Sequence, residues 1–156
     1  MPSLVGSEMC IRDSMGAATV LMASGEDLPG NVKAVIADCG YTSEWDEFQR
    51  EADTLHIPWF PVLNATSVLS KVRDGYDFKQ ASALAQVKKS RIPTLFIHGS
   101  SDELVPYSML GELYAAAACE KEELTVEGAG HALSSSVAPT LYWRTVEDFI
   151  AKYLDR

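Results

Sequence analysis

The sequence predicts an α/β fold built on a parallel sheet. Three apolar runs have the composition of buried strands, and they cover residues 32–37, 93–98 and 124–126. Stretches with helical periodicity separate these runs along the chain. Strands that alternate with helices join by right-handed crossovers and form one sheet with helices packed on it. We therefore expect about three parallel strands with flanking helices.

The first helix and strand come from two apolar stretches of different kinds. Residues 15–24 are small and apolar almost throughout, which is typical of a helix buried on all sides, and Gly25 is well placed to end it. Residues 32–37 form a short apolar run between Gly30-Asn31 and an Asp-Cys-Gly turn at 38–40. A short run with these boundaries is typical of a strand covered on both faces.

A lid-like insertion is expected at about residues 41–90. Its composition is mixed, and short helices are predicted at about 43–52, 61–73 and 80–88. Trp45, Trp59 and Phe60 are candidates for the wall of an apolar pocket. Ordinary helical packing would produce the same pattern, and this alternative stays open.

The regular alternation of strands and helices resumes after the insertion. Residues 93–98 predict a strand, and Pro106 is placed to open a helix. Residues 124–126 predict a brief strand, and Pro139 opens the last helix. That helix carries an apolar stripe at spacings of three and four, formed by Tyr142, Trp143, Val146, Phe149, Ile150, Tyr153 and Leu154.

Composition and charge narrow the possible functions. The 156 residues suit one domain, with a net charge of −9 from 13 basic and 22 acidic side chains. Such a surface repels phosphates, so we expect no nucleic-acid partner and no binding to anionic membranes. No apolar run reaches about 18 residues, so no membrane segment is expected. The spacing of Cys10, Cys39 and Cys119 matches no metal motif and favours reduced thiols in a cytosol-like compartment.

Ser14, Asp102 and His131 carry the strongest chemical signal. A serine hydroxyl becomes a nucleophile when a base removes its proton, and an acid fixes the tautomer of that base. Asp102 and His131 each follow a predicted strand, and Ser14 precedes a helix. The carboxyl ends of parallel strands share one edge of a sheet, so we expect the three side chains to meet there. Taken singly, Ser14 could be a helix cap and Asp102 a turn residue.

Three stretches carry a resemblance to a known family. They are Ser-Met-Gly-Ala-Ala at 14–18, Ile-Pro-Thr-Leu-Phe-Ile-His-Gly at 92–99 with Asp102, and Gly-Ala-Gly-His at 128–131. Residues 14–156 resemble the C-terminal half of a bacterial α/β-hydrolase of the serine-aminopeptidase or prolyl-oligopeptidase-like type. The resemblance implies a truncated α/β-hydrolase fold.

The resemblance also implies roles for individual residues. Ser14 would be the nucleophile, His131 the general base and acid, and Asp102 the acid that orients His131. The backbone N–H of Met15 would be one donor of the oxyanion hole, and the second donor has no candidate in the sequence. Asp38 is a rival acid, but the loop of Asp102 matches the family pattern more fully. Further nearby residues take no catalytic role: Glu103 lies one residue out of frame, His98 has a structural position, and His56 has no motif around it.

Residues 1–13 do not match the family. Gly6, Glu8 and Arg12 argue against a central strand there, and Arg12 stands where a nucleophile elbow has glycine. The segment looks like translated adapter sequence joined to a truncated gene, with a divergent natural N-terminus as the alternative. We therefore expect a non-native or disordered segment at 1–13 and a partial domain at 14–156. Without a strand before Ser14, residues 32–37 would form an exposed edge of the sheet.

The function implied by the resemblance is that of a serine hydrolase. A carboxylesterase or peptidase-like enzyme would cleave a small-molecule ester or amide through an acyl-enzyme, with no cofactor and no metal. This chain, lacking part of the domain, is expected to be weakly active or inactive. A non-catalytic α/β binding module and an assembly artefact without independent function are the alternatives, and the oligomeric state stays open.

Overall fold

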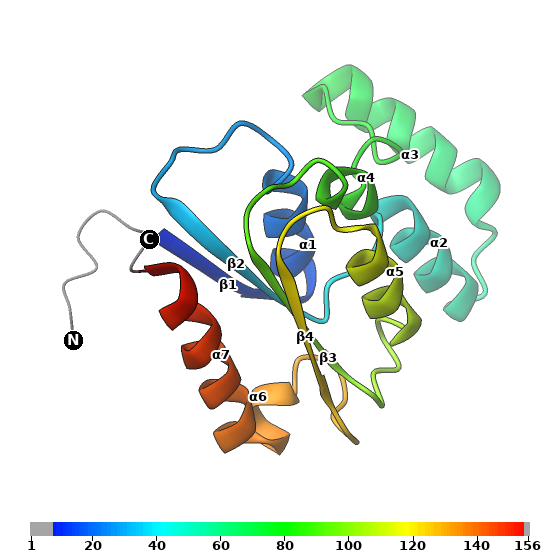
Figure 1. Ribbon diagram of the computed structural model, residues 1–156. Helices are drawn as coiled ribbons and strands as arrows, with labels where there is room; N and C mark the ends of the chain where they lie inside the picture. Colours follow the sequence, from blue (N-terminus) through cyan, green and yellow to red (C-terminus); the bar gives the residue numbers. More distant parts are fainter. Residues whose placement is uncertain (1–7, 155–156) are drawn as a thin grey trace.

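The computed structural model describes residues 8–154. Positions 1–7 of the expected adapter-like segment therefore lie outside the described residues. Strands and helices alternate along the chain, and Figure 1 shows them in order. The elements are β1 (Glu8–Asp13), α1 (Ser14–Ala23), β2 (Val32–Asp38), α2 (Glu44–Thr54), α3 (Trp59–Asp74), α4 (Ala83–Val87), β3 (Thr94–Gly99), α5 (Ser108–Ala116), β4 (Lys121–Val126), α6 (Ser134–Val137) and α7 (Pro139–Leu154).

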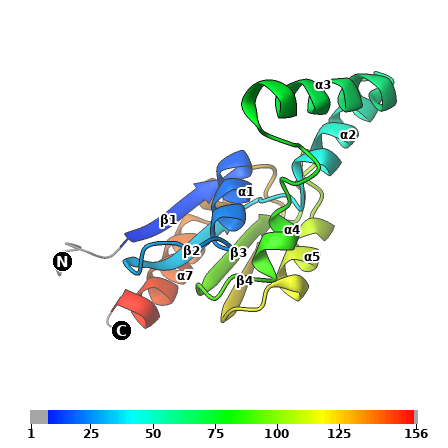
Figure 2. The ribbon, with the colours of Figure 1, turned by 90° about the horizontal axis from the view of Figure 1, so that it is seen from above.

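Within the described residues, four parallel strands form one sheet in the order β1-β2-β3-β4. Figure 2 shows α1, α4 and α5 along one face of the sheet and α7 along the other. Each strand is followed by a helix before the next strand begins, so every crossover carries at least one helix. This arrangement confirms the predicted α/β class and its parallel sheet.

The core has two parts because alternate residues of a strand point to opposite faces. Val35 and Ala37 of β2 pack with the α1, α4 and α5 side, while Ala34 and Ile36 pack with α7. A central strand covered on both faces needs a continuous apolar sequence, and β2 has one. The larger buried side chains of the two layers are Leu21, Phe96, Leu110 and Leu113 on one face and Leu95, Ile97, Tyr142 and Phe149 on the other.

The predicted strands and helices after residue 14 are confirmed, with small shifts at their ends. The strand predicted at 124–126 begins earlier, at Lys121, and α7 begins at Pro139 as expected. The helix expected from Pro106 begins at Ser108. Pro106 instead lies in the preceding turn, where its carbonyl accepts the N–H of Met109.

The strand β1 corrects the expectation for residues 8–13. These residues are neither disordered nor without a strand, because Glu8–Asp13 pairs in parallel with β2 and leads directly into Ser14. The main chain supplies this pairing, and Ile11 packs against the α7 side of the core. Arg12 is exposed, so its charge does not oppose the strand. As a result, β2 is an interior strand, and the predicted exposed edge at 32–37 is wrong.

Residues 41–90 contain the three predicted helices, and α2 and α3 project beyond the sheet (Figures 1 and 2). Ser43 caps α2 by accepting the N–H of Asp46 at 3.1 Å, and α3 ends at Gly75, which has a positive φ of 72°. An apolar pocket of about 300 Å³ lies between α2 and α3, and Trp59 is part of its wall. Among the described residues, no helix is both long enough and apolar enough to cross a lipid bilayer.

Truncation of Phe149 tests the α7 side of the core. Phe149 is fully buried, so Phe149→Ala should lower the free energy of unfolding by about 3–5 kcal/mol through lost burial and a cavity. Urea denaturation followed by circular dichroism measures this change. Leu141→Ala on the same helix is the control, because Leu141 is half exposed and should change the value by less than about 1 kcal/mol. Equal losses in both variants would contradict the packing described.

Candidate active site

The candidate site lies where the four parallel strands end. Ser14 follows β1, Cys39 follows β2, and the loops that carry Asp102 and His131 follow β3 and β4. Parallel strands present their carboxyl ends at one edge of the sheet, and ligands of such sheets bind outside that edge. The topology therefore gathers four polar side chains that are far apart in the sequence.

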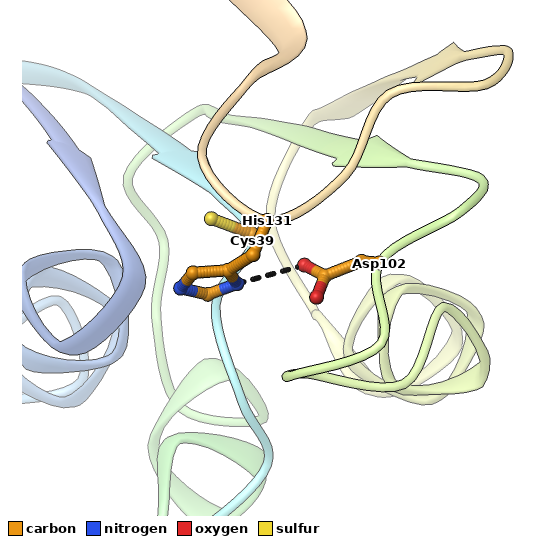
Figure 3. A group of neighbouring side chains, drawn as sticks. All are labelled: Cys39, Asp102 and His131. Atoms are coloured by element: carbon orange, nitrogen blue, oxygen red, sulfur yellow. Dashed lines mark hydrogen bonds and ion pairs between the residues drawn. The ribbon is translucent and has the colours of Figure 1, made fainter.

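The structure brings together the three residues that the sequence singled out. Nε2 of His131 lies 2.8 Å from Oγ of Ser14, and Nδ1 of His131 lies 2.9 Å from Oδ2 of Asp102. Figure 3 shows the second of these contacts. A carboxylate only accepts hydrogen bonds, so Nδ1 donates to Asp102 and the unprotonated Nε2 accepts the hydroxyl proton of Ser14. This is the arrangement in which an imidazole can remove a proton from a serine.

Asp102 is held inside its own loop. Its Oδ1 accepts the N–H groups of Leu104 and Val105, each at 2.9 Å, while Oδ2 faces His131. The Asp102 side chain has no exposed surface, whereas that of His131 is 19% exposed. Hydrogen bonds from two amides and a ring compensate the carboxylate for its loss of water. The acid is thus buried with its Oδ1 held in the loop, and the imidazole keeps access to the outside.

Ser14 lies at a sharp strand-to-helix turn. It is the first residue of α1 and has a φ of 50°, which is a strained conformation for a residue with a side chain. The turn brings Arg12 close to Gly16, and a Cβ added at Gly16 would lie 3.2 Å from the Cβ of Arg12. Gly16 therefore supplies the room that a glycine at position 12 would otherwise give. This explains how Arg12 is tolerated two residues before Ser14.

Met15 follows Ser14 in the first turn of α1, a helix of 10 residues. Backbone N–H groups in the first turn of a helix have no partner within the helix, and they carry the positive end of its dipole. The Met15 side chain itself is exposed. Its amide is thus in the right part of the helix for the oxyanion role expected from the sequence, and that role stays a prediction.

Cys39 also belongs to the site, although the sequence analysis did not predict it there. It is buried and has a φ of 48°, and the backbone of Ser14 and of Ala132 lies near enough to its sulfur to favour the thiolate. Ala132 also has a positive φ, of 56°. Burial, reinforced by the nearby charge of Asp38, raises the pKa of the Cys39 thiol to about 12, so it stays protonated. The signal for it was its position directly after a buried strand.

Cys39, Asp102 and His131 together form the one described group with the composition of a metal site, and their ligand atoms lie within 4.8 Å of one another. The carboxylate and the imidazole already hydrogen-bond to each other, and the thiol keeps its proton. A metal ion would have to displace these bonds and that proton. The donor set therefore fits proton transfer between side chains better than metal coordination.

Comparison with known proteins identifies the family. Residues 9–156 match the prolyl oligopeptidase family. The chain belongs to this family. The match begins within β1, so residues 9–13 belong to the matched region, contrary to the expectation from the sequence.

Two curated relatives cover most of the chain. It is 31% identical over 141 residues to the uncharacterized protein YqkD of Bacillus subtilis, covering 88% of this chain and 46% of YqkD. It is 28% identical over 119 residues to the uncharacterized protein Rv2307c of Mycobacterium tuberculosis, covering 76% of this chain and 36% of that protein. The chain thus spans less than half the length of these two relatives.

Solved structures of related fold include an esterase and a peptidase. The Pyrococcus furiosus esterase Pf2001 has a TM-score of 0.70 at 19% identity, covering 95% of this chain and 54% of the esterase. The Pyrococcus horikoshii acylaminoacyl peptidase has a TM-score of 0.70 at 16% identity, covering 96% of this chain and 24% of the peptidase. At these identities the likeness shows the fold, which is that of the α/β-hydrolases.

Asp38, the rival acid, contacts other residues than His131. Its Oδ1 accepts the hydroxyl of Ser134 at 3.1 Å, and its carboxylate also accepts a hydrogen bond from Tyr142. Burial raises the pKa of Asp38, although these hydrogen bonds act in the opposite direction. Asp38 therefore fastens α6 and α7 to the end of β2. Glu103 and His56 are exposed, and the contacts of His131 go to Ser14 and Asp102.

Adding a side chain at Gly99 should disturb the site through the backbone. A Cβ at Gly99 would overlap with the carbonyl group of Ala129, two residues before His131. Gly99→Ala should therefore lower the free energy of unfolding by about 1–3 kcal/mol and shift the His131 loop. Urea denaturation measures the loss. Gly111→Ala in α5 is the control, because a Cβ there meets nothing within 4 Å, and unchanged or higher stability is expected.

The Asp38 carboxylate should make stability depend on pH. Its pKa is higher in the folded chain than its ordinary value of 3.8, so folding favours the protonated form. Its stabilising contribution is present at low pH and is lost as the pH rises through the folded pKa. Asp38→Asn cannot titrate and keeps an acceptor for Ser134. Its stability relative to the native chain should therefore increase as the pH rises above 3.8.

Denaturation at a series of pH values tests this, with Asp77→Asn as a control of opposite sign. A hydrogen bond from Lys71, with help from the N–H of Lys79, lowers the pKa of Asp77. The stability of Asp77→Asn relative to the native chain should therefore fall as the pH rises. An Asp38→Asn curve that runs parallel to the Asp77→Asn curve would contradict the account of Asp38.

Proposed function

We propose that the chain comes from a serine hydrolase that cleaves an ester or amide of a small molecule through an acyl-enzyme. The observation that carries the proposal is the continuous connection of Ser14 to His131 to Asp102 by hydrogen bonds of 2.8 and 2.9 Å. Membership of the prolyl oligopeptidase family supports it. The solved proteins of related fold include an esterase and an acylaminoacyl peptidase, which favours a substrate with an acyl group.

In the proposed reaction, Oγ of Ser14 attacks the carbonyl carbon of the substrate while its proton moves to Nε2 of His131. The carbonyl π electrons move onto oxygen, and a tetrahedral intermediate forms. The bond to the leaving group then breaks, and the proton on Nε2 passes to the leaving alcohol or amine. Asp102 stays ionised and stabilises the imidazolium through Nδ1. The product of this half-reaction is an ester of Ser14.

Water completes the cycle by the same steps in reverse. Nε2 of His131 takes a proton from water as the oxygen attacks the acyl carbon, and Ser14 leaves with that proton. The partial exposure of the His131 side chain suits this step, because water must reach Nε2. The amide of Met15 would stabilise the oxyanion in both halves of the reaction.

We also propose that this chain has weak activity. An oxyanion hole uses two backbone donors, and the described residues offer a candidate for only the one after Ser14. Loss of one donor lowers the rate by about 10²–10³.

We propose that α2 and α3 act as a lid. The apolar pocket between these helices favours a substrate that carries an apolar group.

A fluorophosphonate reagent tests the proposal, because it forms a covalent bond only with an activated serine. The chain should be labelled at Ser14, and Ser14→Ala should abolish the labelling. His131→Ala should slow it by about 10²-fold or more, because the general base is lost. Mass spectrometry of the intact protein and of its peptides measures both rate and site.

Ser136→Ala is the matched control, because this serine is exposed near the same loop and should label no differently from the native chain. A folded chain that takes up no label at saturating reagent would contradict the proposal. That result would instead favour the alternative that the chain is a non-catalytic binding module. Equal labelling of the native chain and of Ser14→Ala would also contradict it.

A further inference from the structure

His98 is a buried histidine that the proposed reaction does not use. It lies near the end of β3, next to Gly99, and its side chain is only 1% exposed. Its ring packs edge-on against Tyr107, with ring centroids 6.0 Å apart. A histidine in the core is common as a space-filling group with one hydrogen bond. The contacts of its Nε2 decide whether it does more.

Nε2 of His98 lies 3.0 Å from the carbonyl oxygen of Val105. A carbonyl only accepts, so Nε2 carries the hydrogen and donates it. The same nitrogen lies 3.3 Å from Oδ2 of Asp102, the oxygen that also receives Nδ1 of His131. Val105 in turn donates its N–H to Oδ1 of Asp102 at 2.9 Å. His98, Val105 and Asp102 therefore form a closed ring of contacts.

This ring of contacts restrains the part of Asp102 that matters for His131. The amides of Leu104 and Val105 fix Oδ1, but they leave the carboxylate free to pivot about that oxygen. The N–H of His98, which donates to Val105, also places partial positive charge beside Oδ2, and both side chains are buried. It also holds the carbonyl of Val105, and with it the loop that carries Asp102. An apolar ring of similar size would fill the space but provide neither restraint.

We propose that His98 is a positioning residue that aims Oδ2 of Asp102 at Nδ1 of His131 through the donor on its Nε2. The inference rests on the proposed function, because aiming the acid matters only if His131 is the base. It differs from a space-filling role in one respect that can be measured. The effect depends on a donor at the position of Nε2, and apolar volume cannot replace it.

Three substitutions separate the donor from the volume. His98→Gln can place its amide N–H near the position of Nε2, whereas the shorter His98→Asn cannot reach it. His98→Leu keeps apolar volume and removes the donor. The asparagine and glutamine variants bury the same amide, so the comparison between them isolates the reach of the donor.

The measurement is fluorophosphonate labelling of Ser14 in the whole chain, resolved into the affinity for the reagent and the rate at saturation. His98→Asn and His98→Leu should lose about tenfold or more in the saturated rate with unchanged affinity, since misplaced groups slow the chemistry rather than binding. His98→Gln should recover most of the native rate. A glutamine variant that is folded and as slow as the asparagine variant would overturn the proposal, as would native rates in all three.

Amide hydrogen exchange at Leu104 and Val105 provides a second readout that needs no activity. Both amides donate to Oδ1, so they should exchange faster in the asparagine and leucine variants and at the native rate in His98→Gln. If the native chain takes up no label, the proposed function fails, but this exchange pattern still tests the role of His98. Unchanged protection in the asparagine variant would overturn it. A leucine variant that does not fold leaves the decision to the asparagine and glutamine pair.

Discussion

The contact between His131 and Asp102 depends on two loops that leave the adjacent strands β3 and β4 and pack directly on each other. The N–H of Ser101 donates to Ala129 at 3.0 Å, and the hydroxyl of Ser100 accepts the N–H of Gly128 at 2.9 Å. Gly99 allows the two backbones to approach this closely. The parallel pairing of Thr94–Gly99 with Lys121–Val126 sets the register of these loops. The acid and the base thus meet because of the sheet, before any side chain is considered.

Backbone strain is concentrated beneath the site. Ser14, Cys39 and Ala132 all have positive φ, and the sulfur of Cys39 lies beside the backbone of the other two. Such conformations cost about 1–3 kcal/mol each and persist where the surroundings determine them. Here β1, β2 and the His131 loop converge on one buried, protonated thiol. Cys39 therefore links the turn that carries Ser14 to the loop that carries His131.

The sequence predicted the elements whose apolar pattern is local. It did not predict features that depend on contacts between distant residues. Continuous apolar runs predicted β2 and β3, and the stripe after Pro139 predicted α7, because burial on both faces or on one leaves a clear pattern. β1 was missed because an edge strand tolerates the charge of Arg12 and depends on pairing with β2. The resemblance favoured Asp102 over Asp38, but the residues alone could not exclude Asp38, since both follow buried strands. The structure shows that Asp38 accepts a hydrogen bond from Ser134 and that Asp102 accepts one from His131.

The proposed proton transfer requires that the ring of His131 carry its proton on Nδ1 and leave Nε2 free to accept from Ser14. Nitrogen NMR of the ¹⁵N-histidine-labelled chain at neutral pH measures this directly, because protonated and unprotonated ring nitrogens resonate far apart. We expect Nδ1 of His131 to be protonated and Nε2 unprotonated, and no such preference in Asp102→Ala. A neutral ring protonated at Nε2 in the native chain would contradict it, since that nitrogen could not accept the serine proton.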